Sequence, residues 1–575
     1  MILRELIAEK ISKASGVNQE LVEKLVFFPE KKEFGNASVK CFALASILKK
    51  KPEEAAAELA KKLNGKKEFK EVTAVNAFCN IWFSDAFLFE NLKEVYEKGI
   101  SPLKKEKKKI MVEFSQPNPN KPMHLGHLRN DFLGMSISKT KSFLGNRVIK
   151  VNLINDRGIH ICQMMTAYKN YGNNETPEST KMKGDHFIGK YYVLFQKKVK
   201  EKPELNDEAH KMLEDWEKGD KKVRELWKKL VSFAVAGFNE TYELIGSEFD
   251  EWFYESNYYD KAKPLIDLGM KKKVFVEDEE RGIKTNLKSE KLPDKTVLRG
   301  DGTSIYFTND LALTKHKVED YDLDECFWVV ASEQNLYFQQ LFATFKLLGF
   351  EWYKKCKHLN YGLVLLPEGK MKSREGKVVD ADNLINKIKD LAKKELKKRE
   401  EKNVEKEPRK KLNEKELEKR AMTIALAALK FYLINHELHK DILFVPEKTI
   451  SFEGRTGAYL LYSYARANSI LKKTGAKRAI KDFKGYEFNE IENELLNKFS
   501  VFNDVLLSNG SKLEMHLICS YLLELAALFN SFYNKVPVLN GTEEETKVRL
   551  VIVELFMIHL KKGLELLNIE VLDEM

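Results

Sequence analysis

The chain has 575 residues, of which 43% are apolar and 32% are charged. This composition excludes a disordered protein, and at about 150 residues per domain the length predicts roughly three or four domains. Lysine and arginine number 98 against 87 aspartate and glutamate residues, so the formal net charge is +11. Such a mild excess is compatible with a polyanionic partner and equally with a well-solvated surface.

Six cysteines occur along the chain without a Cys-x-x-Cys pair. Their spacing argues against a structural zinc site and their number against a disulfide scaffold, so a reducing compartment is expected. No apolar run reaches the ~20 residues that a membrane-spanning helix needs. The amphipathic N-terminal segment lacks a small-residue cleavage site and is expected to form a domain helix. The sequence therefore predicts a cytoplasmic protein with no membrane partner.

Residues 1–105 predict a small α/β unit. Apolar residues at helical spacing predict helices over Leu3–Ile11 and Pro52–Leu63, the second with a proline in its first turn. The alternation of apolar and polar residues over Val72–Phe83 predicts a strand. A lysine-rich stretch at 104–109 is expected to link this unit to the next.

A strand–loop–helix–strand pattern begins at Lys109. The apolar run Ile110–Ser115 predicts a strand, and the three prolines of 116–122 end it because proline supports neither helix nor ladder. A helix is predicted over His124–Leu144, and a second strand over Val148–Ile154. This order is typical of a βαβ unit and hence of a parallel sheet with a right-handed crossover.

The remaining pattern predicts an interrupted sheet followed by helices. Residues 170–295 are polar and helical, and are expected to be an insertion. The sheet pattern resumes at Cys326–Val330 and ends with a strand near Leu363–Leu366. The Lys/Glu-rich stretch 387–420 favours a solvated helical face over a nucleic-acid-binding one, and 421–575 is helical.

The first chemistry-bearing segment is His124-Leu125-Gly126-His127, at the start of the predicted helix after a strand and a proline-rich loop. Free N–H groups and the positive dipole end of a helix N-terminus favour phosphate. The two histidines lie three apart, hence on one side of the first turn, and Gly126 would let a flat ring approach the backbone. Two helix-capping histidines remain the structural alternative.

The second segment is Lys370-Met371-Lys372-Ser373-Arg374, which follows the predicted strand near Leu363–Leu366. Cations on a glycine-flanked loop can close over a polyphosphate and stabilise charge in a transition state. Taken alone, an ordinary basic surface loop is the better interpretation.

Together these two segments resemble the signature motifs of class I aminoacyl-tRNA synthetases, His-Ile-Gly-His and Lys-Met-Ser-Lys-Ser. Further segments are similar to the arginyl-tRNA synthetase family: Val112–Asn118, Tyr306–Ala312, Val329–Gln334, Ser451–Leu460 and, less sharply, Phe34–Ala37. The resemblance covers nearly the whole chain and is weakest over 170–295.

The resemblance implies a fold with three parts. They are an N-terminal tRNA-binding domain (1–105), a Rossmann-like α/β catalytic domain (106–400) with the helical insertion at about 170–295, and a helical linker with an all-α anticodon-binding bundle (401–575). It also implies a reaction in which ATP, with Mg²⁺ on its phosphates, activates L-arginine to arginyl-adenylate. The arginyl group then passes to the 3′ end of tRNA(Arg), with AMP and diphosphate as products. Pyrophosphate exchange is expected to need tRNA, and a monomer without a structural metal is expected.

The same resemblance assigns residues to roles. The catalytic residues are His124, His127, Lys121 and Lys370. The ATP-binding residues are His124, Gly126, His127, Lys370, Met371, Lys372 and Ser373. The arginine-binding residues are Glu113, Asn118, His127, Tyr306, Asp310 and Gln334.

One departure from the family pattern concerns the second signature segment. Ser373 stands where the second catalytic lysine is expected. Many arginyl enzymes share that loss and carry a lysine just before the histidine motif, as Lys121 does here. Lys121 is therefore the expected substitute cation, with Lys372 and Arg374 as rivals on the loop itself.

Each arginine-pocket residue also has a structural alternative. Asp310 could be a helix N-terminal charge, Tyr306 a core residue, Gln334 a helix cap, Glu113 a surface ion-pair partner and Asn118 a loop-shaping residue. If Tyr306 opens a helix, its four-residue spacing from Asp310 places both on one face. Two other functions stay open: another nucleotidyl-transfer enzyme of this fold, and a non-catalytic tRNA-binding relative.

Overall fold

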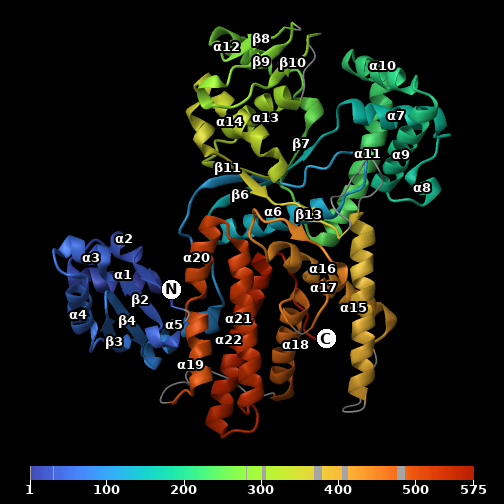
Figure 1. The fold of residues 1–575 in the computed structure, drawn as a ribbon. Helices are drawn as coiled ribbons and strands as arrows, with labels where there is room; N and C mark the ends of the chain where they lie inside the picture. The colour runs from blue at the N-terminus through green and yellow to red at the C-terminus, as the bar shows by residue number, and fades with distance from the viewer. Residues whose placement is uncertain are drawn as a thin grey trace. The chain divides into compact units, whose positions relative to one another are not determined.

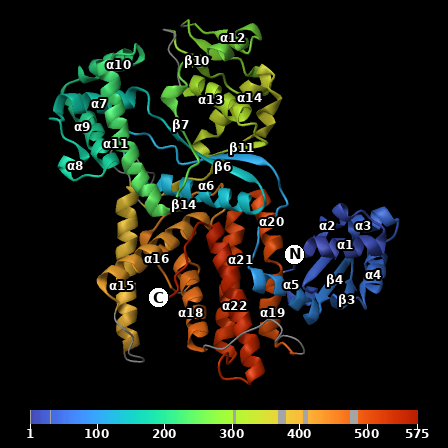
Figure 2. The same ribbon diagram turned by 180° about the vertical axis from the view of Figure 1, so that it is seen from behind.

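The computed structural model describes residues 2–29, 31–279, 281–300, 306–367, 379–404, 412–452, 454–474 and 486–575. The chain divides into two compact units, Met1–Leu103 with Ser451–Met575, and Lys104–Ile450 (Figures 1 and 2). Each unit has its own architecture, α/β with a helical bundle in the first and a parallel sheet with helices in the second.

The first unit contains a four-stranded antiparallel sheet in the order β1-β2-β4-β3. Its strands are β1 (Val26–Phe27), β2 (Ala37–Lys40), β3 (Phe69–Val75) and β4 (Phe78–Phe83). Its helices are α1 (Leu3–Ser15), α2 (Gln19–Glu23), α3 (Cys41–Leu48), α4 (Pro52–Leu63) and α5 (Asp85–Lys98). The single strand predicted over Val72–Phe83 is wrong, because the chain reverses at Asn76 (φ 52°) and the two halves pair as a hairpin.

The same unit holds a bundle of long helices. They are α18 (Gly457–Thr474), α19 (Glu490–Ser500), α20 (Phe502–Lys512), α21 (Met515–Lys535) and α22 (Glu543–Leu566). Among the described residues, α21 is the one helix whose length and apolarity would allow it to cross a bilayer. It packs against α18, α19, α20 and α22, as a core helix does. The predicted all-α region near the C-terminus is confirmed.

The second unit is built on a five-stranded, all-parallel sheet in the order β12-β11-β5-β6-β7. The strands are β5 (Lys109–Glu113), β6 (Arg147–Ile154), β7 (Glu251–Tyr254), β11 (Glu325–Ala331) and β12 (Cys356–Tyr361). The predicted parallel sheet and its βαβ opening are confirmed. β5 lies at the centre, with α6 (Leu125–Phe143) leading from it to β6.

Two details of the predicted sheet are wrong. The edge strand β7 lies inside the segment 170–295, which was expected to be a helical insertion. The other edge is β12, whereas the strand expected near Leu363–Leu366 is the two-residue β13 (Val364–Leu365), paired with β14 (Ile442–Leu443) outside the main sheet. Edge strands carry polar residues on their exposed positions, so β12, with the sequence Cys-Lys-His-Leu-Asn-Tyr, lacks an apolar run.

Helices and a small sheet lie between the strands of this parallel sheet along the chain. Between β6 and β7 lie α7 (Ile159–Tyr171), α8 (Pro177–Thr180), α9 (Gly184–Glu201), α10 (Leu205–Glu217) and α11 (Lys221–Ile245). Between β7 and β11 lie α12 (Lys263–Lys271), β8 (Phe275–Glu277), β9 (Ile283–Thr285), β10 (Thr296–Leu298) and α13 (Tyr306–Asp320). After β11 come α14 (Asn335–Leu348), α15 (Ala381–Val404), α16 (Glu414–Ile434) and α17 (Pro446–Thr449). The segment 170–295 is therefore not purely helical.

The strand order creates a topological switch point. From β5 the chain moves to β6 on one side and later to β11 on the other, so a crevice opens at the carboxyl ends of β5 and β11. α6 approaches the end of β5 closely, because the Phe114 ring lies 2.2 Å from where a Cβ on Gly134 would stand. Ligands of open α/β sheets bind in this crevice, and the first turn of α6 faces it.

Candidate active site

The first turn of α6 is closed by its two histidines. His124 is the N-cap, and its Nδ1 accepts a hydrogen bond from the Gly126 amide at 3.2 Å. The Nδ1 of His127 accepts from the His124 amide at 3.0 Å, and the two rings stack with centroids 3.9 Å apart. The pair therefore forms a capping box that satisfies two otherwise orphaned amides.

This capping arrangement fixes the chemical form of both rings. A neutral imidazole that accepts at Nδ1 carries its proton on Nε2. Burial, together with the charge of Lys121, lowers the pKa of His124 to about 3. Burial also holds the pKa of His127 well below its usual value, with His124 and Lys121 adding to the effect. At neutral pH the helix start thus presents two Nε2–H donors without positive charge.

Lys121 lies in the proline-bounded turn just before these histidines. Burial lowers the pKa of Lys121, and its charge contributes to the lowered pKa values of both histidines. The following Pro122 packs against Gly189 of α9, whose Cβ would come within 2.7 Å of the proline ring. The turn is therefore held rigidly and brings a desolvated cation to the helix N-terminus.

The second signature segment lies outside the described residues. Lys370, Met371, Lys372 and Ser373 all fall in 368–378. Its exit is described: the Leu125 amide donates to the Val379 carbonyl at 3.1 Å, and the Ala381 amide donates to the Met123 carbonyl at 3.0 Å. His124 and Asp380 form an antiparallel bridge. The chain leaving this segment therefore runs alongside the entry to α6.

Two of the predicted arginine-pocket residues lie on the first turns of α13. The helix begins at Tyr306, so the predicted common face of Tyr306 and Asp310 is confirmed. Tyr306 is 51% exposed, and its hydroxyl would lie 3.1 Å from a Cβ at Gly158, so it lies directly over that glycine. Burial raises the pKa of Asp310 to about 6, although the Tyr337 hydroxyl donates to its Oδ2 and Lys317 adds favourable charge.

A buried carboxylate beside this pair was missed from the sequence. Glu255 follows β7 directly, and its Oε1 accepts from Asn309 Nδ2 at 2.8 Å. Its Oε2 has no hydrogen-bond partner among the described residues. Burial, with repulsion from Asp310 and Asp156, raises the pKa of Glu255 to about 8. Because the ionised forms of both carboxyl groups are disfavoured, a bound cation would stabilise them.

The other three predicted pocket residues have different environments. Both carboxylate oxygens of Glu113 have partners, one the ammonium of Lys317 and the other Gln116 Nε2 at 2.8 Å. Glu113 is therefore part of an ion pair, but the pair is buried and not at the surface. Asn118 is exposed in the proline-rich loop. Gln334 is exposed at the N-cap of α14, where its side chain makes no capping hydrogen bond.

These features define a class of protein. A parallel sheet with a histidine pair capping the helix after its central strand is the arrangement of class I aminoacyl-tRNA synthetases. The family model described as "tRNA synthetases class I (R), catalytic domain" matches residues 92–445. Two further models, "Arginyl tRNA synthetase N terminal domain" and "DALR anticodon binding domain", match residues 1–83 and 460–575.

Individual relatives agree with the family models. An arginine–tRNA ligase of Parabacteroides distasonis is 36% identical and spans 95% of this chain and 94% of its own. One of Treponema denticola is 40% identical over 90% and 89% of the two chains. The Thermus thermophilus arginyl-tRNA synthetase structure is similar with a TM-score of 0.81, 25% identity and complete coverage of both chains. The chain belongs to the arginyl-tRNA synthetase family.

Proposed function

We propose that this chain joins L-arginine to the 3′ end of tRNA(Arg) at the expense of ATP, with the groups around the switch point as its active site. The observations that carry the proposal are the neighbouring carboxyl groups of the half-buried Asp310 and the buried Glu255, both with raised pKa values, and a helix N-terminus that presents two neutral histidine donors. A planar guanidinium has donors for two carboxylates, and a helix N-terminus suits a phosphate.

Selection of arginine follows from the charges of the pocket. The guanidinium binds between Asp310 and the unpartnered oxygen of Glu255, and Tyr306 covers it from the solvent side. Both carboxyl groups have raised pKa values without the substrate, so a bound cation stabilises their ionised forms. Gln334, Asn118 and the buried Glu113 belong to the surrounding wall.

Activation of arginine uses position and charge without a covalent enzyme intermediate. The carboxylate of arginine attacks the α-phosphorus of ATP, the bond to the bridging oxygen breaks, and diphosphate leaves. Mg²⁺ bound with ATP would neutralise charge on the phosphates. The Nε2–H groups of His124 and His127 donate to phosphate oxygens, and Gly126 lets the adenosine approach the helix. Lys121 supplies the cation for the α-phosphate, and Lys370 with its neighbouring loop residues Met371, Lys372 and Ser373 holds the leaving phosphates.

Transfer to tRNA follows at the same site. A ribose hydroxyl of the terminal nucleotide attacks the carbonyl carbon of arginyl-adenylate, and AMP leaves. We propose that residues 1–105 and 401–575 bind the tRNA, the latter at the anticodon, around a catalytic domain of residues 106–400. Function as a monomer in the cytoplasm fits these roles.

A charging assay tests the proposal. Purified protein is incubated with total tRNA, ATP, Mg²⁺ and each of the twenty amino acids in turn. Acid-stable charging with arginine alone is expected, and arginine-dependent pyrophosphate exchange is expected only when tRNA is present. Charging with another amino acid and not with arginine would refute the function, and full exchange without tRNA would refute its tRNA dependence.

A further inference from the structure

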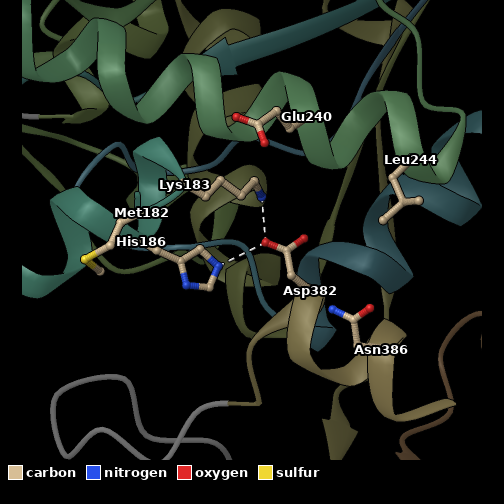
Figure 3. A pocket seen from close by; sticks show the side chains of 7 residues that line it. All are labelled: Met182, Lys183, His186, Glu240, Leu244, Asp382 and Asn386. Carbon is tan, nitrogen blue, oxygen red and sulfur yellow. Dashed lines mark hydrogen bonds and ion pairs between the residues drawn. The ribbon is translucent and has the colours of Figure 1, made fainter. Parts of the chain in front are cut away.

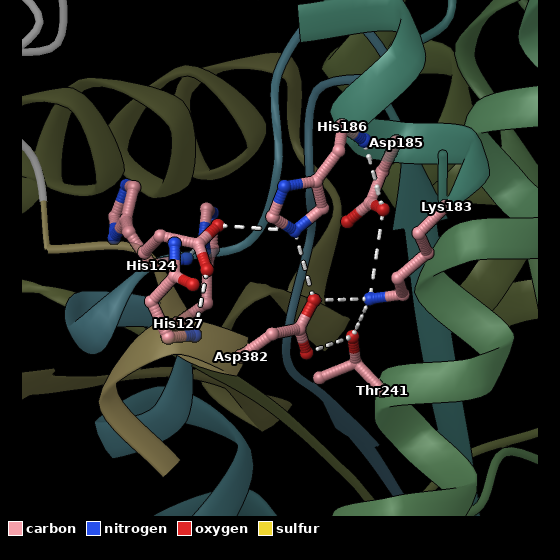
Figure 4. A network of polar contacts seen from close by, with 9 residues as sticks. His124, His127, Lys183, Asp185, His186, Thr241 and Asp382 are labelled. Atoms are coloured by element: carbon pink, nitrogen blue, oxygen red, sulfur yellow. Dashed lines mark hydrogen bonds and ion pairs between the residues drawn. The ribbon is translucent and has the colours of Figure 1, made fainter. Parts of the chain in front are cut away.

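A polar cluster outside the substrate pocket joins the insertion helices to the exit of the signature segment. Lys183 Nζ lies 2.6 Å from Asp382 Oδ2, and His186 Nε2 donates to the same oxygen at 3.0 Å. Thr241 of α11 donates to Asp382 Oδ1 at 3.2 Å. His186 also lies 3.3 Å from Asp380 Oδ2. Figure 4 shows these groups converging on Asp382 from α9 and α11.

The cluster is an ion-pair network. Asp185, His186 and Asp382 could together offer three ligand atoms to a metal ion. Lys183, however, contacts Asp382 and lies 3.5 Å from Asp185 Oδ1, so an ammonium already provides the positive charge. A cavity of about 400 Å³ opens beside the network, lined among others by Lys183, His186 and Asp382 (Figure 3).

Asp382 is well placed to hold the end of the signature segment. It stands at the start of α15, four residues after 378, where the described chain resumes with Val379. The backbone between them is bonded to the entry of α6 through the Leu125 and Ala381 amides. A carboxylate fixed at Asp382 therefore fixes the strand that borders the histidine pair.

Helix α9, which carries His186, also contacts the turn that precedes the histidine pair. Three residues after His186, Gly189 lies against Pro122, which follows Lys121 in the turn before the histidines. One helix of the insertion thus contacts both the turn that carries Lys121 and the residues Asp380 and Asp382, which follow the second signature segment.

We propose that Asp382 is a positioning residue, which anchors residues 379–381 to α9 through Lys183 and His186 and so holds in place the backbone that pairs with the start of α6 at His124 and Leu125. The expected effect on kcat rests on the proposed function. The expected effect on the backbone at Leu125 and Ala381 rests only on the contacts described above. Burial opposes ionisation of Asp382, but hydrogen bonds from His186 and Lys183 outweigh it and lower its pKa to about 2. The anchor is therefore charged throughout the physiological range.

The test replaces the charge while keeping the shape. In Asp382→Asn, kcat for arginine- and tRNA-dependent pyrophosphate exchange should fall ~10-fold to 10²-fold, while KM for arginine stays near that of the parent protein. Amide hydrogen exchange at Leu125 and Ala381 should accelerate. Asp382→Glu should restore part of kcat. Asp390→Asn, at an exposed position of the same helix, is the matched control and should change neither quantity.

Three results would overturn the proposal. One is unchanged kcat together with unchanged exchange at the two amides. Another is faster exchange throughout the unit with a lower Tm, which would make Asp382 an ordinary stabilising residue. The third concerns His186→Gln, which removes only one of the contacts to Asp382 and serves if Asp382→Asn does not fold. Unchanged amide exchange and unchanged kcat in His186→Gln would show that Asp382 is not an anchor. An inactive parent protein would refute the proposed function. The structural claim would still be decided by amide exchange, because that measurement needs no substrate.

Discussion

Replacing Asp310 by asparagine separates arginine recognition from folding. The substitution keeps an oxygen for the Tyr337 hydroxyl and removes the charge that we propose pairs with the guanidinium. Burial raises the pKa of Asp310 from 3.8 to about 6 despite the favourable contacts with Tyr337 and Lys317, so its ionised form is disfavoured by about 3 kcal/mol in the free protein. A bound guanidinium relieves this cost, and loss of one partner of a buried charge pair typically costs about 3–5 kcal/mol.

The expected result is a loss of kcat/KM for arginine of ~10²-fold or more, with KM for ATP nearly unchanged. The assay is pyrophosphate exchange with tRNA present, at varied arginine and then at varied ATP. The free variant should unfold at the same or a higher temperature at pH 7, because the disfavoured charge is gone. Asp322→Asn, at an exposed position just after α13, is the control. Unchanged use of arginine, or an equal loss for ATP, would remove Asp310 from the pocket.

The remaining predictions concern the other charged groups. Glu255→Gln should lower kcat/KM for arginine by a similar factor. Burial raises the folded-state pKa of Glu255 from 4.5 to about 8, so the parent protein should lose stability as pH rises between these values. Glu255→Gln should lose less stability over the same range. Measurements of Tm against pH for both proteins would test this. Lys121→Ala should lower kcat for activation ~10²-fold, with a smaller effect on KM for arginine. If Lys121→Ala keeps a kcat near that of the parent protein and Lys372→Ala has a strongly lowered kcat, Lys372 and not Lys121 supplies the cation. His124→Asn should lower kcat ~10²-fold. Because the pKa of His124 is about 3, the pH–rate profile of the parent protein should show no ionisation of His124 between pH 5 and 8. An ionisation in that range that disappears in His124→Asn would show that His124 is not permanently neutral.

Local patterns predicted the parts of the site that lie close together in the sequence. The prolines of 116–122 and the apolar spacing after His124 located the strand end and the helix start. Four-residue spacing placed Tyr306 and Asp310 on one helical face, as α13 confirms. These signals succeed because each depends on a few consecutive residues.

Long-range pairing explains what the sequence did not reveal. β7 has only four residues after a run of polar helices, and it is recognisable as a sheet strand only through its pairing with β6. Missing β7 also meant missing Glu255 at its carboxyl end, the kind of position where functional residues of parallel sheets gather. Likewise, Lys317 pairs with Glu113 across 204 residues of sequence, so the surface position considered for Glu113 could not be tested without the fold.

A crystal structure with a non-hydrolysable arginyl-adenylate analogue would test the site most directly. The account predicts guanidinium nitrogens within about 3 Å of carboxylate oxygens of both Asp310 and Glu255, and the Nε2 atoms of His124 and His127 on the phosphate side of the analogue. An analogue bound with its guanidinium away from both carboxylates, or with its phosphate remote from the α6 N-terminus, would contradict it.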